Sequence, residues 1–488
     1  MNRKLLFAWA LLLALFRSLI QAQEKPPEQE TGGLHVNLAS NIDRPLRYTP
    51  IGTDFVITNG TEFFNRPLYG NNTAFRVDAG DKPEFSLYLP GRGGNLRLGI
   101  KTEKGVKWLN DVDRVVAHYH PGSMVYEIKD ASLMETRELR VTVLPLSGTK
   151  GFIVSAAMNS AWMPIELVWA YGGANGMKGR RNGDIGCERE PVSKFFQLEP
   201  EQCTNSDFTI TANTFTLKTK SATISGVASI GAQLALGDAN LWNSPDKLFV
   251  EREPGATDPT PLSPLLVGHI PLPPAQSVYL AFQQVVDDMV TLRTEELPEA
   301  FTVAEERRRA IAERVSVETP DPYINAAAAA LNVAADGVWD EAQQSFMHGA
   351  VAWRNRLLGW RGQYAGDALG WHERTAAHIA GFAKQQNTGS IPEQLPPADD
   401  DANLSRSENA LHSNGNLGKN HYDMNLVAMD ALFRHLLWTG DRQFAVRLWP
   451  VLERHLAWER RLFRREFGPE KLPLYEAYAC IWASDDLA

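Results

Sequence analysis

The chain has few cysteines and lacks the signatures of several common enzyme classes. Only three of its 488 residues are cysteine, and none stands in a Cys-x-x-Cys or Cys/His spacing that would indicate structural zinc. Neither a Gly-x-Ser-x-Gly elbow nor a P-loop is present, so the sequence carries no usual motif of a serine hydrolase or of a nucleotide-binding enzyme. We therefore expect no metal site and no cofactor.

Clustered positive charge is also missing. The chain has 49 Lys and Arg against 58 Asp and Glu, a net charge of −9, whereas binding to nucleic-acid phosphates requires grouped basic side chains. The basic run Arg307 to Arg309 directly follows two glutamates and is typical of the solvated face of a helix. This charge pattern predicts no nucleic-acid partner.

Long apolar runs are confined to the N-terminus. The run over residues 5–15 follows basic residues and precedes the small residue Ala22, which predicts a signal peptide over residues 1–22. An uncleaved membrane anchor is the alternative, disfavoured because the run is short and Arg17 interrupts its end. We expect a periplasmic or secreted protein with no stable membrane span after cleavage, and a disordered polar tether over residues 23–33.

Two of the cysteines are expected to form a disulfide. Cys187 and Cys203 bracket a segment whose glycine and prolines indicate a loop excursion. In an exported protein such a pair predicts a disulfide that staples the loop, with two unlinked thiols as the alternative. Cys480 is left over in an apolar stretch.

Short apolar or alternating runs, punctuated by turn residues, fill residues 34–297. Such spacing is typical of antiparallel strands. The expected strands include residues 55–58, 85–89, 96–100, 114–118, 124–128, 138–144, 153–158, 165–169, 208–217 and 278–283. That many strands in one block predict a large β-sandwich. The proline-rich stretch from Pro254 to Pro274 is expected to wrap the edge of the sandwich.

After Pro298 the pattern changes from strands to helices. Residues 298–319 carry helix formers and charges paired at i,i+4, which predict a linker helix. From Pro320 on, apolar residues recur at helical spacing, and helix breakers such as Thr439-Gly440-Asp441 separate the stripes. Antiparallel helix hairpins in series are therefore expected over residues 320–488.

The helical region also holds the side chains that a carbohydrate site needs. Sugars present C–H faces and hydroxyl edges, so their sites combine aromatic platforms with polar groups. The tryptophans beside loop signals are the candidate platforms: Trp360, Trp371 and Trp482. Those on helix stripes are expected in the core: Trp438, Trp449 and Trp458. The polar candidates for substrate binding are Arg361, His372 and Asn414.

Four carboxyl groups are candidates for catalysis. Glycoside hydrolysis needs two carboxyl groups across the bond, one protonated to assist the leaving oxygen and one ionised to activate water or attack the sugar. Asp367 and Glu373 lie around an expected helix start, where Asp367 could equally be an N-cap. Asp485 and Asp486 follow Trp482, an apolar wall of the kind that raises the pKa of an acid catalyst, and another helix start is the alternative.

Several motifs resemble those of six-hairpin glycosidases, whose catalytic domain is an (α/α)6 toroid. Trp438-Thr439-Gly440-Asp441 followed by Leu448-Trp449-Pro450 is similar to a helix-turn-helix of that superfamily, and the helix expected at Pro322 resembles its first barrel helix. Residues 356–362, Arg-Leu-Leu-Gly-Trp-Arg-Gly, are similar to a motif of α-L-rhamnosidases, with Gln363 where that motif has an aspartate. The chain also distantly resembles glucoamylase-like enzymes.

Two other segments resemble a poorly characterised bacterial family in which a β-sandwich precedes the toroid. They are residues 172–186 and the ending Trp482-Ala483-Ser484-Asp485-Asp486. The resemblance implies a multi-domain chain, β then α, with an N-terminal β-sandwich followed by an incomplete (α/α)6 toroid. Because residues 320–488 are too few for six helix pairs, we expect the sequence to be a fragment of a longer protein.

The function implied by the resemblance is that of an exported glycoside hydrolase. It would act on polysaccharide or oligosaccharide fragments by carboxylate acid/base catalysis, with a carbohydrate as its partner. Two alternatives stay open: a non-catalytic glycan-binding or scaffold protein, and a polysaccharide lyase on the same toroid.

Overall fold

The computed structural model describes residues 46–159, 164–179, 192–250, 261–286, 291–351, 354–358, 361–390 and 422–475. The chain divides into two compact units, Met1–Thr49 and Pro50–Ala488. Only residues 46–49 of the first unit are described, so the predicted signal peptide and tether lie outside the described residues. Among the helices that are described, none is both long and apolar enough to cross a membrane.

Strands dominate the first part of the described chain. They are β1 (Thr49–Ile51), β2 (Asp54–Thr58), β3 (Arg66–Tyr69), β4 (Arg76–Ala79), β5 (Glu84–Tyr88), β6 (Arg92–Thr102), β7 (Gly105–Trp108), β8 (Arg114–His120), β9 (Ser123–Lys129), β10 (Leu139–Pro145), β11 (Gly151–Met158), β12 (Glu166–Gly172), β13 (Asp207–Thr211), β14 (Thr214–Lys218), β15 (Thr223–Ala228), β16 (Gln233–Asp238), β17 (Pro264–Pro271) and β18 (Ser277–Val285). Short helical turns lie between some of them: η1 (Leu109–Asp111), α3 (Val192–Phe195), η2 (Pro200–Cys203), η3 (Ala239–Leu241) and α4 (Pro245–Leu248).

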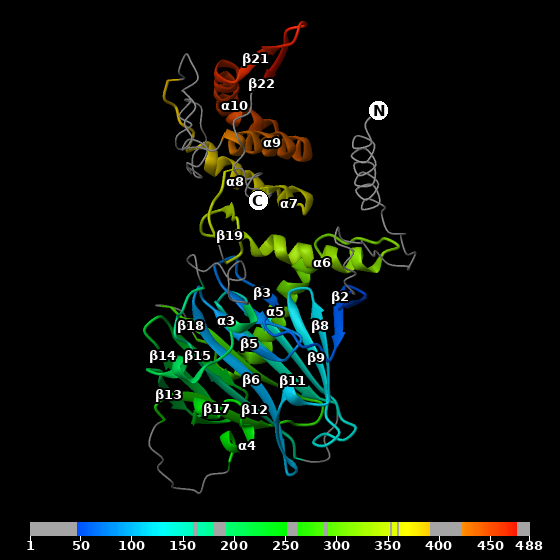
Figure 1. The fold of residues 1–488 in the computed structure, drawn as a ribbon, viewed down its shortest axis with the longest axis vertical. Helices are drawn as coiled ribbons and strands as arrows, with labels where there is room; N and C mark the ends of the chain where they lie inside the picture. Colours follow the sequence, from blue (N-terminus) through cyan, green and yellow to red (C-terminus); the bar gives the residue numbers. More distant parts are fainter. Residues whose placement is uncertain are drawn as a thin grey trace, which may run out of the picture. The chain divides into compact units, whose positions relative to one another are not determined.

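These strands form two sheets that share one core (Figure 1). One sheet has ten strands in the order β1-β2-β8-β9-β10-β11-β18-β15-β14-β13, and the other has eight, β16-β17-β12-β6-β5-β4-β3 with β7 beside β6. Alternate side chains of both sheets enter the core, as Val141 and Val154 do from the first and Leu98 and Trp169 from the second. The predicted β-rich N-terminal part is confirmed.

The neighbouring strands β17 and β18 complete the two sheets separately. β17 lies between β16 and β12 in the eight-stranded sheet, whereas β18 lies between β11 and β15 in the ten-stranded sheet. The prediction that the proline-rich stretch wraps a sheet edge was therefore wrong for residues 264–271, which pair on both sides. Pro264 and Pro271 are the first and last residues of β17, positions where proline is tolerated.

Helices dominate after β18, which confirms the predicted order of sheets followed by helices. They are α5 (Leu297–Ala312), α6 (Pro322–Gly337), α7 (Gln363–Ala368), α8 (His372–Ala383), α9 (Tyr422–Thr439) and α10 (Arg442–Leu462). The 3-10 turn η4 (Thr294–Glu296) precedes α5, and two small hairpins accompany the helices: β19 (Trp339–Asp340) with β20 (Ser345–Phe346), and β21 (Arg464–Phe467) with β22 (Leu472–Tyr475).

The predicted break between two long helices is present at the α9–α10 turn, drawn in orange in Figure 1. Gly440 adopts a left-handed backbone with φ +62°, and the Asp441 carboxylate accepts a hydrogen bond from the Phe444 amide at 2.9 Å, which caps α10. Trp458 is buried as predicted, but Trp438 and Trp449 are 60% and 54% exposed. Helical spacing alone could not tell which side of each helix packs against described residues.

A buried carboxylate connects α6 with α5, α8 and the sheets. Asp336 accepts a hydrogen bond from Arg307 of α5 at 3.0 Å and another from Arg374 of α8 at 2.9 Å. Its backbone carbonyl accepts a hydrogen bond from the Asn72 side chain at 2.8 Å, in the β3–β4 connection. This carboxylate therefore sets the position of α8, which carries part of the candidate site.

Candidate functional site

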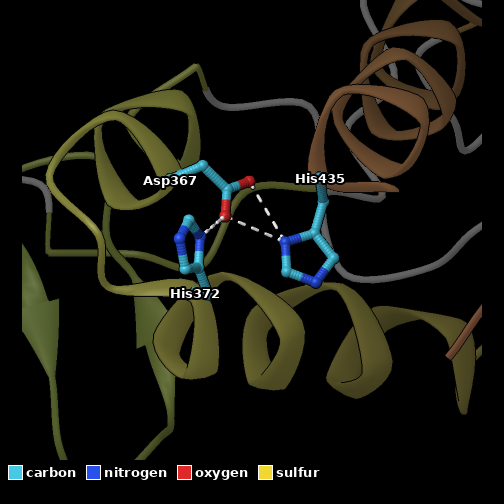
Figure 2. A group of neighbouring side chains, drawn as sticks. All are labelled: Asp367, His372 and His435. Atoms are coloured by element: carbon cyan, nitrogen blue, oxygen red, sulfur yellow. Dashed lines mark hydrogen bonds and ion pairs between the residues drawn. The ribbon is translucent and has the colours of Figure 1, made fainter. Parts of the chain in front are cut away.

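Two histidines, one from α8 and one from α9, contact the carboxylate of an aspartate in α7 (Figure 2). The carboxylate of Asp367, near the end of α7, lies 2.8 Å from Nδ1 of His372, the first residue of α8. The same carboxylate lies 2.9 and 3.1 Å from Nδ1 of His435 in α9. Asp367 and His435 are buried, whereas the His372 side chain is 41% exposed.

Glycines place α7 against α8. A side chain at Gly366 would meet the Thr375 hydroxyl at 2.4 Å and the Phe346 ring at 2.7 Å, so only glycine allows this close approach. Gly370 has φ +71°, a left-handed conformation that turns the chain from α7 into α8. Arg314 donates to the carbonyls of Leu369 and Gly370 in this turn at 2.7 and 2.9 Å.

The hydrogen bonds fix the roles of the three groups. The carboxylate oxygens accept, so each imidazole donates its Nδ1 proton to Asp367 and has Nε2 as its second ring nitrogen. Because His435 is buried, His372 is the imidazole that solvent can reach. Asp367 lies inside α7 and caps no helix, so its alternative interpretation as an N-cap was wrong.

The same three residues could also supply ligands to a metal ion. Their ligand atoms all lie within 4.8 Å of one another, and two histidines with one carboxylate form a common donor set. The separations of 2.8 to 3.1 Å between carboxylate oxygens and Nδ1 atoms are hydrogen-bond distances, so these groups bond to one another in this structure.

An open hollow of about 550 Å³ lies between α7 and α9. Its lining residues are Arg361, Tyr364, Leu426, Val427, Asp430 and Arg434. Tyr364 donates its hydroxyl proton to the Asp430 carboxylate at 2.6 Å, and Arg434 donates to the same carboxylate at 2.7 Å. Burial and the neighbouring Asp430 raise the pKa of Tyr364 to about 12, so its hydroxyl remains a donor at neutral pH.

Three other predicted site residues lie in the described part of the chain. Arg361 lines the hollow and is exposed. Trp371 is half-buried, with the guanidinium groups of Arg374 and Arg314 at 4.6 and 5.9 Å from its ring. Glu373 is exposed in the first turn of α8. Several predicted residues lie outside the described residues: Trp360, Asn414, Trp482, Asp485 and Asp486.

Sequence reasoning assigned no role to His435, Tyr364, Asp430 or Arg434. A signal for His435 was available, since it continues the buried α9 stripe that contains Ala428 and Leu432. A buried histidine on such a stripe requires a polar partner.

The predicted disulfide between Cys187 and Cys203 is not found among the described residues. Cys203 is a free thiol that packs in an apolar cluster with Trp108, Trp242 and Leu265. This burial raises its pKa to about 12, which keeps the thiol protonated. Cys187 lies outside the described residues.

Comparison with known proteins yields a family and distant structural similarities. A family described as "Domain of unknown function (DUF4450)" matches residues 89–305, and no curated protein matches the chain. The structure is similar to a bacterial glucoamylase complexed with acarbose, with 9% identity, a TM-score of 0.44, and coverage of 77% of this chain and 57% of that chain. The structure is also similar to a putative kojibiose phosphorylase from the human microbiome, with 10% identity, a TM-score of 0.42, and coverage of 87% of this chain and 61% of that chain. The chain thus spans less than two thirds of either protein, and none of these comparisons concerns α-L-rhamnosidases.

Proposed function

We propose that α7, α8 and α9 carry the active site of a carbohydrate-cleaving enzyme, in which His372 transfers the proton. The observation that carries this proposal is the contact between the buried Asp367 carboxylate and Nδ1 of the partly exposed His372. A carboxylate in this position fixes the tautomer of the imidazole and stabilises the imidazolium that forms during proton transfer. Asp367 is therefore a positioning residue, and His372 is the group that touches substrate.

Cleavage of a glycosidic bond requires a proton at the leaving oxygen and a second group that assists water or the sugar carbon. His372 would supply or remove the proton through Nε2. Glu373, which is exposed in the first turn of α8 and was predicted as catalytic from the sequence, would be the second carboxyl group. The helices would belong to the (α/α)6 toroid of six-hairpin glycosidases, which the motifs in residues 322–458 resemble.

The hollow beside this group supports a sugar as the substrate. Tyr364, Leu426 and Val427 offer aromatic and apolar surface, while Arg361 and Asp430 offer charged groups. Sugar sites combine these two kinds of surface, because a sugar ring has apolar faces and hydroxyl edges. Export to the periplasm or the medium is part of the proposal and would bring the site to extracellular glycans.

The test is hydrolysis of a broad glycan panel by the full chain, with reducing-sugar release as the readout. His372→Asn should lower kcat/KM by about 100- to 10,000-fold, the usual contribution of a general acid or base. Asp367→Asn should lower kcat with little change in KM, because the amide cannot stabilise the imidazolium that forms during proton transfer. A merely structural loss would instead lower the melting temperature of the variant.

His269→Asn is the matched control. His269 contacts Glu166 at 3.2 Å across β12 and β17, so it is also a histidine beside a carboxylate but belongs to the sheets. Its variant should retain wild-type activity. Full activity in His372→Asn, or the absence of sugar release from every glycan, would contradict the proposal. Glycan binding without turnover would instead favour a non-catalytic glycan-binding protein.

Elimination is a second candidate reaction, favoured by the two arginines that line the hollow. A polysaccharide lyase removes a proton next to a carboxylate that positive groups neutralise. His372 could act as the base, and Arg361 could neutralise the carboxylate. Ultraviolet absorbance of a new double bond in the product distinguishes elimination from hydrolysis.

A further inference from the structure

The hollow between α7 and α9 holds a guanidinium group that makes no hydrogen bond or ion pair with the described residues. Arg434 is held by Asp430 at 2.7 Å, and its guanidinium lies 5.1 Å from the centre of the Tyr364 ring. Arg361 makes no hydrogen bond or ion pair with any part of the chain that the structure describes, although it lines the same hollow. Arg361 acts on Asp430 and Tyr364 through its charge alone, so its N–H groups are left to donate hydrogen bonds to a ligand.

The only described acid in the hollow's lining is already engaged. The Asp430 carboxylate accepts a hydrogen bond from the Tyr364 hydroxyl at 2.6 Å and another from the Arg434 guanidinium. Burial opposes the effect, but these two hydrogen bonds and the positive charges of Arg434 and Arg361 hold the pKa of Asp430 below its usual value. The lining thus carries a net charge of about +1 at neutral pH, from two arginines and one aspartate.

We propose that this hollow is a subsite for an acidic sugar, whose carboxylate pairs with Arg361 while its ring lies against Leu426 and Val427. A planar guanidinium matches a carboxylate with two parallel hydrogen bonds, which makes arginine suited to this recognition. The inference rests on the proposed function, because it names the substrate class of the same site.

The subsite lies close to the proton-transfer group. Tyr364 precedes Asp367 by three residues on α7, a rise of about 4.5 Å along the helix, and Asp430 precedes His435 by five residues on α9, about 7.5 Å. Tyr364 contacts Asp430, and Asp367 contacts His435, so the two pairs are successive connections between the same helices.

The experiment is isothermal titration of the full chain with short oligomers of galacturonate, glucuronate and mannuronate, each beside a neutral oligosaccharide of equal length. At least one acidic oligomer should bind at least tenfold more tightly than its neutral counterpart, and its affinity should fall as salt rises. Arg361→Gln should remove this preference. Arg361→Lys should retain part of it, because lysine keeps the positive charge but lacks the planar guanidinium that forms two parallel hydrogen bonds.

Arg442→Gln is the matched control, since Arg442 is an exposed arginine in the first turn of α10 and does not line the hollow. Its affinities should equal those of the wild type. Equal binding of acidic and neutral oligomers, or unchanged binding by Arg361→Gln, would overturn the inference. So would Arg361-dependent binding of inorganic phosphate in the absence of any uronate binding.

Binding and turnover separate this inference from the proposed function. His372→Asn should keep the preference for acidic oligomers while losing cleavage. Cleavage of neutral glycans without an Arg361-dependent preference would refute the acidic subsite alone. An Arg361-dependent preference without cleavage of any glycan would refute the proposed function alone.

Discussion

His378 of α8, unlike the partly exposed His372, is fully buried. Its Nδ1 accepts hydrogen bonds from the Ser345 hydroxyl at 2.8 Å and the Phe346 amide at 3.1 Å, so the proton of the neutral ring is on Nε2. Burial lowers its pKa to about 3, and the positive charge of Arg356 acts in the same direction. His378 therefore remains neutral in the folded protein over the physiological range.

This pKa predicts a specific acid sensitivity. Below a pH of about 6.5 the unfolded chain binds a proton at His378 that the folded chain refuses until about pH 3, so folding stability should fall by roughly 1.4 kcal/mol per pH unit. His378→Asn keeps an acceptor for Ser345 but cannot titrate. Its melting temperature should be lower at pH 7.5 and should depend less on pH between 6.5 and 4. Parallel pH profiles of the two proteins would contradict this.

At the level of single residues, local sequence patterns indicate only those candidates that lie close together in the chain. Arg361, His372 and Glu373 stand close to Gly366 and Gly370, so composition and turn signals indicate them together. His435 lies 68 residues after Asp367, and only the packing of α9 against α7 and α8 brings the two into contact. Long-range contacts of this kind leave no local pattern.

At the scale of the helices, the α9–α10 turn depends on one side chain. Asp441→Ala should remove the cap of α10 and lower the free energy of unfolding by about 1 kcal/mol. Asp441→Asn is the matched control, because asparagine caps helices as well as aspartate does. Chemical denaturation measures both. Equal losses in the two variants would indicate that the charge matters and that the cap does not.

Strand prediction succeeded where alternating runs ended at turn residues and failed where those signals conflicted. Residues 208–217 were expected to form one strand, yet they form the hairpin β13–β14, because Ala212 adopts φ +52° without a glycine to mark the turn. β17 was missed because prolines mark both of its ends. In both cases pairing with neighbouring strands overrides the local propensity.

At the scale of the whole molecule, the loss of Asp336 should destabilise the contacts of α6 with both α5 and α8. Asp336→Asn leaves two arginines facing a neutral amide, which should cost roughly 2–3 kcal/mol, less than for a fully buried pair because both arginines are partly exposed. Differential scanning calorimetry should show the unfolding of the helices moving to lower temperature than that of the sheets. Asp321→Asn, which preserves the cap at the other end of α6, should leave the transition unchanged.

The positions of β17 and β18 also govern when the protein can fold during its synthesis. β18 completes the ten-stranded sheet and β17 completes the eight-stranded sheet, so the first stays incomplete until residue 285 has left the ribosome and the second until residue 271 has. Before that, β11 and β15 of the first sheet and β12 and β16 of the second expose unpaired edges, which invite association with other nascent chains. A ribosome that stalls before residue 264 would therefore release a species that needs chaperone protection.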